Sequence, residues 1–132
     1  MTQQAAVPLA TAWCEAFAGV GKPAVHIAFD SACQLHVPGQ SGLAGPYQGA
    51  EAILGVLRRM ADLTGGTLQF VGPRVLTADE HAVAVYGRAT ATRKGRRLDT
   101  DTMHVLALHD GKVSEIWMLF RNQDQVDGFW AT

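Results

Sequence analysis

The chain lacks a strong excess of charge of either sign. Its 132 residues include 11 lysines and arginines and 12 acidic residues, which leaves a formal net charge of -1. Nucleic acids and anionic membrane surfaces attract proteins through dense positive charge, so this balance argues against both as partners. The one dense basic run, Arg93 to Arg97, lies between two predicted strands and is expected to be a solvated turn.

Cysteines and long apolar runs are also scarce. Cys14 and Cys33 are the two cysteines of the chain and are not closely spaced. This pattern favours buried thiols in a cytoplasmic protein over a disulfide framework. No apolar run is long enough to cross a membrane, and Met1 to Ala6 lacks the basic segment of a signal peptide. We therefore expect a cytoplasmic protein without a membrane span.

The signatures of metal and nucleotide sites are missing as well. His26, His81 and His109 show no ligand spacing with carboxylates or thiols, so no metal site is expected. No phosphate-binding glycine loop stands ahead of a helix, so no nucleotide cofactor is expected. We expect a protein that works without a cofactor.

What the sequence does contain is a high share of apolar residues, 48%, against 17% charged residues. This composition and length predict a single domain over residues 1–132 with one substantial core or cavity. Helical spacing opens the chain, with Pro8 suited to a first turn. The other predicted elements are a helical turn over Ala24–Asp30, a strand over Cys33–Val37, a glycine-rich loop over Gly39–Gly49, a helix over Ala50–Leu63, strands over Thr67–Thr77, His81–Arg93, Arg96–His109 and Lys112–Arg121, and a closing helix capped by Asn122.

Two turns predict which side chains share a face of the sheet. Lys94-Gly95 and Asp110-Gly111 are strong hairpin signals between predicted strands. Counting outward from them gives these expected pairs: Val85 with His104, Gly87 with Thr102, Leu106 with Glu115, His104 with Trp117, and Thr102 with Leu119. The shared face would be small and apolar, with His104 near its middle and Glu115 diagonally adjacent.

A one-residue slip in either hairpin would turn this set to the opposite face. That opposite face carries Tyr86, Arg88, Asp99 and Asp101, with Arg88 across from Asp101. Such residues are ordinary on an exterior face or in a subunit contact, which argues against a slip.

The order of helices followed by a long antiparallel meander predicts an α+β domain, with the N-terminal helices packed on one side of a curved sheet. The segment from His36 to Ile53 and the ending from Asp110 to Trp130 resemble the SnoaL-like branch of the nuclear transport factor 2-like superfamily. This resemblance implies a cone-shaped antiparallel sheet with a cavity between sheet and helices. It also implies a homodimer, and a range of activities that includes ketosteroid isomerases, polyketide cyclases, epoxide hydrolases and proteins that only bind.

The acids that those enzymes use are replaced in this chain. The isomerase base position, just before a proline, corresponds to Val37, with His36 beside it. The two oxyanion-hole positions correspond to Trp13 and His104. The stretch where cyclases and epoxide hydrolases place an aspartate holds Trp117 to Leu119 and no acid.

The remaining constellation leads to a hypothesis of a small-molecule cavity enzyme of isomerase, cyclase or hydrolase type. His104 would transfer a proton or hold an oxyanion, and Glu115 would orient its imidazole. His36 would be a second acid or base if its face looks inward, which the sequence leaves open. The expected substrate is apolar, a class that includes polycyclic molecules, and the expected substrate-binding residues are Trp13, Trp117, Val37, Leu119, Val85 and Thr102.

Two other interpretations are open from the sequence. The chain could be a binding module without chemistry, in which a change at His104 alters affinity and no product forms. For His104 itself, the alternative to a ligand-facing role is a core histidine hydrogen-bonded to Glu115 or water. It could also be an interaction protein that pairs with itself through the face carrying Tyr86, Arg88, Met103 and Val105.

Overall fold

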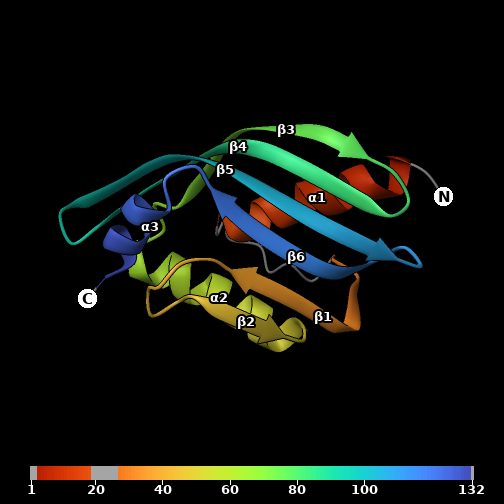
Figure 1. The fold of residues 1–132 in the computed structure, drawn as a ribbon, viewed down its shortest axis with the longest axis horizontal. Helices are drawn as coiled ribbons and strands as arrows, with labels where there is room; N and C mark the ends of the chain where they lie inside the picture. Colours follow the sequence, from red (N-terminus) through yellow and green to blue (C-terminus); the bar gives the residue numbers. More distant parts are fainter. Residues whose placement is uncertain (1–2, 19–26, 132) are drawn as a thin grey trace.

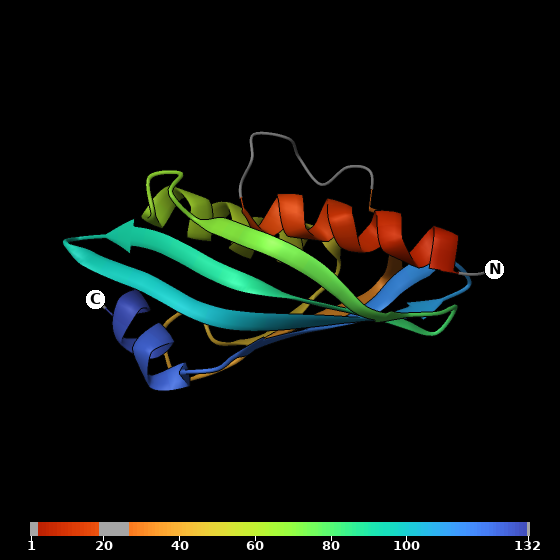
Figure 2. The ribbon, with the colours of Figure 1, turned by 90° about the horizontal axis from the view of Figure 1, so that it is seen from above.

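The computed structural model describes residues 3–18 and 27–131, which form three helices and one six-stranded sheet (Figure 1). The elements follow one another as α1 (Gln3–Phe17), β1 (Phe29–Val37), β2 (Gly45–Gln48), α2 (Ala50–Leu63), β3 (Gln69–Ala78), β4 (Ala82–Arg93), β5 (Arg96–His109), β6 (Lys112–Phe120) and α3 (Gln123–Trp130). Figure 2 shows α1 and α2 over one face of a curved sheet and α3 at one end of it. The predicted α+β arrangement is confirmed.

The sheet is mixed rather than purely antiparallel. Its strand order is β2-β1-β6-β5-β4-β3, so β2 and β3 are the two edges and the sheet does not close. Strands β3 to β6 form the predicted antiparallel meander, but β1 pairs with β6 in parallel. The expectation of an antiparallel sheet was wrong at this one junction, because β1 and β6 are far apart in the chain and no turn signal links them.

The helices differ little from the prediction. Helix α2 has the predicted bounds and buries Ile53, Val56, Leu57 and Met60 in one stripe. Helix α1 begins earlier than expected, so Pro8 lies inside it rather than in its first turn. None of the described helices has the length and apolar character needed to cross a membrane.

Two segments before α2 were predicted wrongly. Of the helical turn expected over Ala24–Asp30, residues 24–26 lie outside the described residues, while Phe29 and Asp30 already belong to β1. The glycine-rich loop contains the edge strand β2, which pairs with the end of β1. Pro46 fits this strand because an edge position does not require its missing N–H in the ladder.

The hairpin of β4 and β5 has the predicted register throughout. Lys94 and Gly95 both have positive φ, 52° and 76°, as the tight two-residue turn requires. Val85 lies opposite His104 and Gly87 opposite Thr102. The inner face of this hairpin is therefore the small, apolar one that the sequence predicted.

The hairpin of β5 and β6 has the predicted register only at its tip. Leu108 pairs with Val113, but the next pair is Ala107 with Glu115, so an extra residue is accommodated in β6 as a β-bulge. Beyond the bulge every partner is displaced by one residue, and His104 lies opposite Met118 instead of Trp117.

The bulge reverses the faces of β6. Ile116 and Met118 are buried, whereas Glu115, Trp117 and Leu119 lie on the face away from α1 and α2, here called the outer sheet face. The predicted placement of Glu115 beside His104 was therefore wrong. The core lies on the inner face, between the sheet and the helices, and its largest fully buried side chains include Trp13, Phe17, Leu35, Ile53, Met60 and Leu106.

Candidate functional site

His104 lies at the centre of the inner sheet face and is fully buried. Aromatic rings surround it: its centroid is 4.8 Å from that of Phe17, 5.2 Å from Phe70 and 6.3 Å from Phe120, all edge-on. Residues of α1, β3 and β6 thus enclose the imidazole.

Hydrogen bonds determine the protonation state of His104. The indole Nε1 of Trp13 donates to His104 Nδ1 at 2.8 Å. An indole nitrogen can only donate, so Nδ1 must be the unprotonated nitrogen and Nε2 must carry the hydrogen. Nε2 is 3.1 Å from Thr102 Oγ1, which itself donates to the carbonyl oxygen of Leu119 at 2.7 Å. The chain of bonds fits one neutral tautomer.

Burial has the same consequence for the charge of the imidazole. Desolvation lowers the pKa of His104 from 6.5 to about 3. A neutral imidazole with both nitrogens bonded to protein groups is poorly suited to general base catalysis near neutral pH. Its geometry is that of a core histidine, but its partners are Trp13 and Thr102 rather than the expected Glu115.

A histidine–carboxylate pair lies on the outer sheet face. His36 Nε2 is 2.6 Å from Glu115 Oε2, and the two side chains are 35% and 37% exposed. The His36 ring stacks on Trp117 with centroids 5.6 Å apart and planes at 16°. The structure thus answers the open question about His36: it faces away from the core, whereas the neighbouring Val37 is buried.

The residues predicted to form one site therefore belong to two groups. The inner group consists of Trp13, Val37, Val85, Thr102 and His104. The outer group consists of His36, Glu115, Trp117 and Leu119. The sheet separates them, so a site in which His104 and His36 act across one substrate does not exist in this fold.

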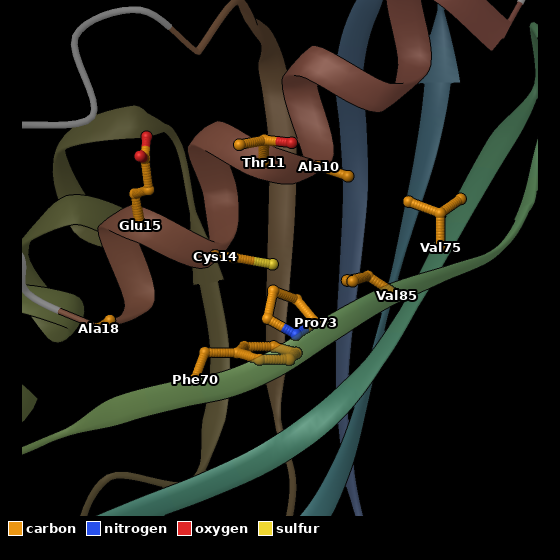
Figure 3. A pocket seen from close by; sticks show the side chains of 9 residues that line it. All are labelled: Ala10, Thr11, Cys14, Glu15, Ala18, Phe70, Pro73, Val75 and Val85. Atoms are coloured by element: carbon orange, nitrogen blue, oxygen red, sulfur yellow. The ribbon is translucent and has the colours of Figure 1, made fainter.

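A cleft of about 290 Å³ lies between α1 and the strands β3 and β4. We call it the α1–β3 cleft. Its lining residues, drawn in Figure 3, are Ala10, Thr11, Cys14, Glu15, Ala18, Phe70, Pro73, Val75 and Val85. Of the residues predicted for the site, Val85 alone is among them. Phe70 belongs both to the lining and to the rings around His104, so it forms a wall between the cleft and the imidazole.

The polar groups of the α1–β3 cleft are few. The Thr11 hydroxyl donates to the carbonyl oxygen of Val7 at 3.1 Å, which engages its hydrogen. Burial raises the pKa of the Cys14 thiol to about 12, so the thiol is protonated at neutral pH and is not a nucleophile. Glu15 is exposed at the edge of the cleft. The cleft can bind an apolar body but supplies no reactive group of its own.

Sequence reasoning missed the helical side of this cleft, although a signal was present. Ala10, Cys14 and Ala18 recur at intervals of four residues, next to the stripe of Trp13 and Phe17. A stripe of small side chains beside a stripe of large ones leaves space along one flank of a helix. Among the residues that the structure describes, no three histidine, cysteine or acidic side chains gather as metal ligands.

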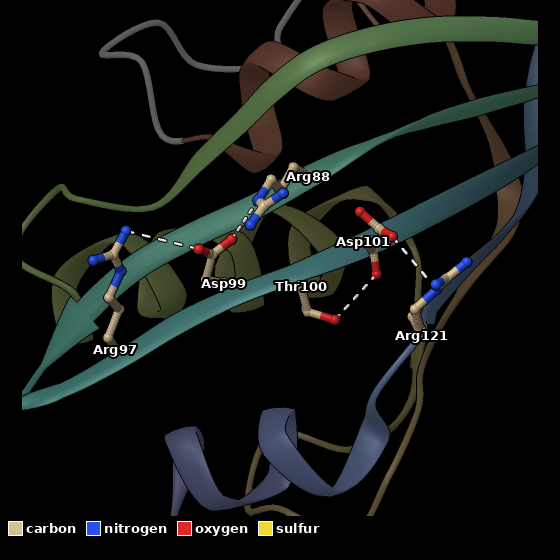
Figure 4. A network of polar contacts seen from close by, with 6 residues as sticks. All are labelled: Arg88, Arg97, Asp99, Thr100, Asp101 and Arg121. Atoms are coloured by element: carbon tan, nitrogen blue, oxygen red, sulfur yellow. Dashed lines mark hydrogen bonds and ion pairs between the residues drawn. The ribbon is translucent and has the colours of Figure 1, made fainter.

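The outer sheet face carries a network of ion pairs, shown in Figure 4. Arg88 lies across from Asp101 as predicted, but its guanidinium pairs diagonally with Asp99. Arg97 Nη2 is 3.7 Å from Asp99 Oδ2, and Arg121 Nε is 3.4 Å from Asp101 Oδ2. These exposed pairs contribute little to stability, but they fix the charged border of this face.

Beside the ion pairs the outer sheet face is apolar and hollowed. A depression of about 210 Å³ is lined by Tyr86, Asp101, Thr102, Met103, Leu119, Phe120 and Arg121. Leu119 is 43% exposed at its edge, which is high for a leucine in a central strand. This is the face that the sequence assigned to a subunit contact.

Comparison with known proteins places this architecture in a family. Residues 10–116 match the SnoaL-like domain. Bal32a, from a soil-derived mobile gene cassette, is 30% identical with a TM-score of 0.87, covering 97% of this chain and 98% of Bal32a. A nuclear transport factor 2-like protein from Burkholderia xenovorans is 20% identical with a TM-score of 0.82, covering 98% of both chains. TerC, co-crystallized with polyporic acid, is 20% identical with a TM-score of 0.70, covering 92% of this chain and 97% of TerC. The chain therefore belongs to the SnoaL-like domain family and has the nuclear transport factor 2-like fold, as its sequence motifs predicted.

Proposed function

We propose that this protein binds a small apolar molecule in the α1–β3 cleft. The observation that carries the proposal is the cleft itself, about 290 Å³ in volume and walled mainly by alanine, valine, proline and phenylalanine side chains. An apolar cavity of roughly 150 Å³ holds one benzene molecule, so this cleft suits a ligand of about two fused rings. A larger polycyclic substrate, which the sequence left open, would need additional space.

A protein of the same fold supports ligand binding in general terms. TerC, which shares the fold at 20% identity, was co-crystallized with polyporic acid. A likeness at this level supports the capacity of the fold to hold a small molecule and leaves the identity of the ligand to the residues of each chain.

Thermal unfolding with a neutral two-ring probe, 1-naphthylmethanol, tests the proposal. A ligand present at about a hundred times its dissociation constant stabilises the folded state by ~2.7 kcal/mol, which shifts the melting temperature by several degrees. Val75→Trp places a large side chain in the cleft from an exposed position, 42% accessible, and should abolish the shift.

A matched control lies on the same strand. Val71 is 46% exposed, but it pairs with Arg88 on the outer sheet face, whereas Val75 pairs with Val85 on the inner face. Val71→Trp should therefore keep the wild-type shift. Equal shifts in the two variants would show that the probe binds outside the α1–β3 cleft. Absence of a shift in the wild type would contradict the proposed function.

Catalysis by His104 is a second proposal, supported by its closeness to the cleft. A ligand in the cleft would be separated from the imidazole by the ring of Phe70, whose centroid is 5.2 Å from that of His104. If that ring moves, the neutral imidazole would have to exchange its Nε2 hydrogen bond to Thr102 Oγ1 for one to a developing oxyanion, as an isomerase or cyclase requires. Loss of product formation in His104→Asn with ligand affinity unchanged would support this role. Turnover that survives the substitution would exclude it.

We also propose a homodimer through the outer sheet face. Leu119 and the adjoining depression offer apolar surface in a self-complementary setting of arginine and aspartate side chains. Sedimentation velocity at micromolar concentration should show a dimer, which Leu119→Lys converts to a monomer. Leu76→Lys, at a 53% exposed position on the edge strand β3, is the control that should remain dimeric. A monomeric wild type would contradict this proposal.

We propose a cytoplasmic location because the two cysteines are free thiols. Cys14 and Cys33 are both free and buried, as the sequence predicted. Free thiols are the usual state in a reducing compartment. Fractionation of cells that express the protein would test the assignment, and recovery outside the cytoplasm would contradict it.

A further inference from the structure

We propose that the ligand of the α1–β3 cleft is a small apolar amine, with its rings against Phe70 and Val85 and its protonated nitrogen at Glu15. The inference rests on the proposed function, because it assigns a chemical class to the ligand of the same cleft. It is drawn from the distribution of charge around the opening.

Glu15 is the one charged residue among the nine that line the cleft. No ion pair or hydrogen bond joins its carboxylate to another residue that the structure describes. The other polar groups are a thiol and a hydroxyl whose hydrogen is engaged by Val7. A ligand with an anionic head would therefore find a negative charge and no strong donor, whereas a cationic head would find an acceptor with no competing partner.

The position of Glu15 in α1 strengthens the negative potential. The helix ends at Phe17, so Glu15 lies in its last turn, and that turn contains no basic residue. The partial negative charge of a helix C-terminus attracts cations and disfavours a carboxylate there. The side chain and the helix end thus add their fields at one end of the cleft, where no described cation balances them.

The arrangement of the lining also sets the orientation of the ligand. Figure 3 shows the side chains of Cys14, Phe70 and Pro73 close together, whereas the carboxylate of Glu15, which is exposed, lies apart from them. A molecule that is apolar at one end and charged at the other can bury its rings and keep its nitrogen in contact with water. This is the arrangement that avoids the large cost of burying an ammonium group.

Isothermal titration with three probes of equal size tests the inference. The probes are 1-naphthylmethylamine, 1-naphthylmethanol and 1-naphthoate, which share one ring system and differ in the charge of the head. We expect wild-type protein to bind the amine about fivefold more tightly than the alcohol, the upper range for an exposed ion pair, and the carboxylate most weakly. Glu15→Gln should bring amine and alcohol to within about twofold of each other.

Glu51→Gln is the matched control, because Glu51 is an exposed glutamate in α2 and does not line the cleft. It should keep the wild-type preference for the amine. Raising the salt concentration should reduce the preference in wild type, since exposed charges are screened.

The outcomes separate the two proposals. Binding of the alcohol with no preference for the amine, or a preference that survives Glu15→Gln, would overturn the inference and leave the proposed function intact. Absence of binding by all three probes would overturn both. A preference lost in Glu15→Gln and kept in Glu51→Gln would establish Glu15 as the residue that selects amines.

Discussion

The buried imidazole of His104 should make the protein less stable as the pH falls from 7.5 to 4.5. Burial lowers the pKa of His104 to about 3 in the folded protein, whereas the ordinary value of 6.5 applies to the unfolded chain. Below pH 6.5 the unfolded chain therefore binds a proton that the folded protein excludes. Protons then favour unfolding, so stability is lost progressively between pH 6.5 and about 3.

The magnitude follows from the two pKa values. Each pH unit inside this window changes the free energy of unfolding by about 1.4 kcal/mol. Near pH 4.5, two units below the unfolded value, the loss should reach about 2.5 kcal/mol relative to pH 7.5. This is a large share of the ~5–15 kcal/mol that holds an ordinary domain folded.

Urea unfolding of wild type and His104→Asn at several pH values measures the effect. Asparagine does not titrate, and its side-chain oxygen can still accept a hydrogen bond from Trp13. We expect the variant to be less stable at pH 7.5, by ~1–3 kcal/mol, because packing and the bond to Thr102 are lost. The difference between the two proteins should shrink steadily as the pH falls.

Comparing wild type with His104→Asn cancels the contributions that other titrating groups make to the pH dependence of stability. A backbone hydrogen bond from His81 lowers the pKa of Asp79, and a side-chain bond from Arg88 lowers that of Asp99, but both aspartates are present in each protein. His81→Asn, in an exposed turn, controls for removal of one imidazole from the unfolded chain. If wild type and His104→Asn lose the same stability over this range, the interpretation of a sealed neutral imidazole is wrong.

Three further substitutions should lower stability in urea unfolding. In Gly87→Ala the new Cβ would lie 2.3 Å from Cε1 of Phe70, so we expect a loss of about 1–3 kcal/mol, and a wild-type midpoint would show that the ring moves freely. In Gly39→Ala the Cβ would lie 2.1 Å from Oδ1 of Asp127 and 2.3 Å from Nε2 of Gln123, on a backbone with φ of +97°. A loss of at least ~2 kcal/mol is expected, and Asp127→Ala in the same background should restore only part of it, because the contact with Gln123 and the positive φ remain. Asn122→Ala removes the N-cap of α3 and should cost about 1 kcal/mol, whereas Asn122→Asp should restore most of it.

The sequence predicted those parts of the fold that depend on local signals. Helix α2 combines an apolar stripe with flanking glycines, and its predicted bounds are the observed ones. The β4–β5 hairpin has a two-residue turn at Lys94-Gly95 and no bulge, so counting outward from the turn gave the true pairs as far as Val85 and His104. In both cases the information lies within a few residues of the element itself.

The candidate site could not be predicted in the same way, because one residue changes the faces of β6. The chain offered a hint at Ser114-Glu115, where two polar residues in succession interrupt the alternation between Val113 and Ile116. Without that correction, Glu115 and Trp117 were assigned to the wrong face. The pairing of Glu115 with His36 further requires the parallel contact of β1 and β6, which no turn encodes.

The α1–β3 cleft depends on tertiary structure to a still greater degree. Its walls come from a helix at the start of the chain and an edge strand whose register shifts between Val71 and Arg74. Gly72-Pro73 lies at this shift and is a breaker pair in the sequence, but the side of the sheet on which the break leaves space depends on how α1 packs. Periodicity alone does not contain that information.

The bulge in β6 also makes the spacing of residues in this strand as important as their chemistry. The bulge absorbs one extra residue between Val113 and Glu115, so deletion of Ser114 would leave regular pairs and keep Glu115 and Trp117 on the outer sheet face. If the bulge straightened with every residue retained, Glu115 and Trp117 would instead turn into the core and Ile116 would turn outward. No single substitution in β6 exchanges so many environments at once. Within this fold, the presence of the bulge decides whether a carboxylate of the last strand faces the interior or the outer surface.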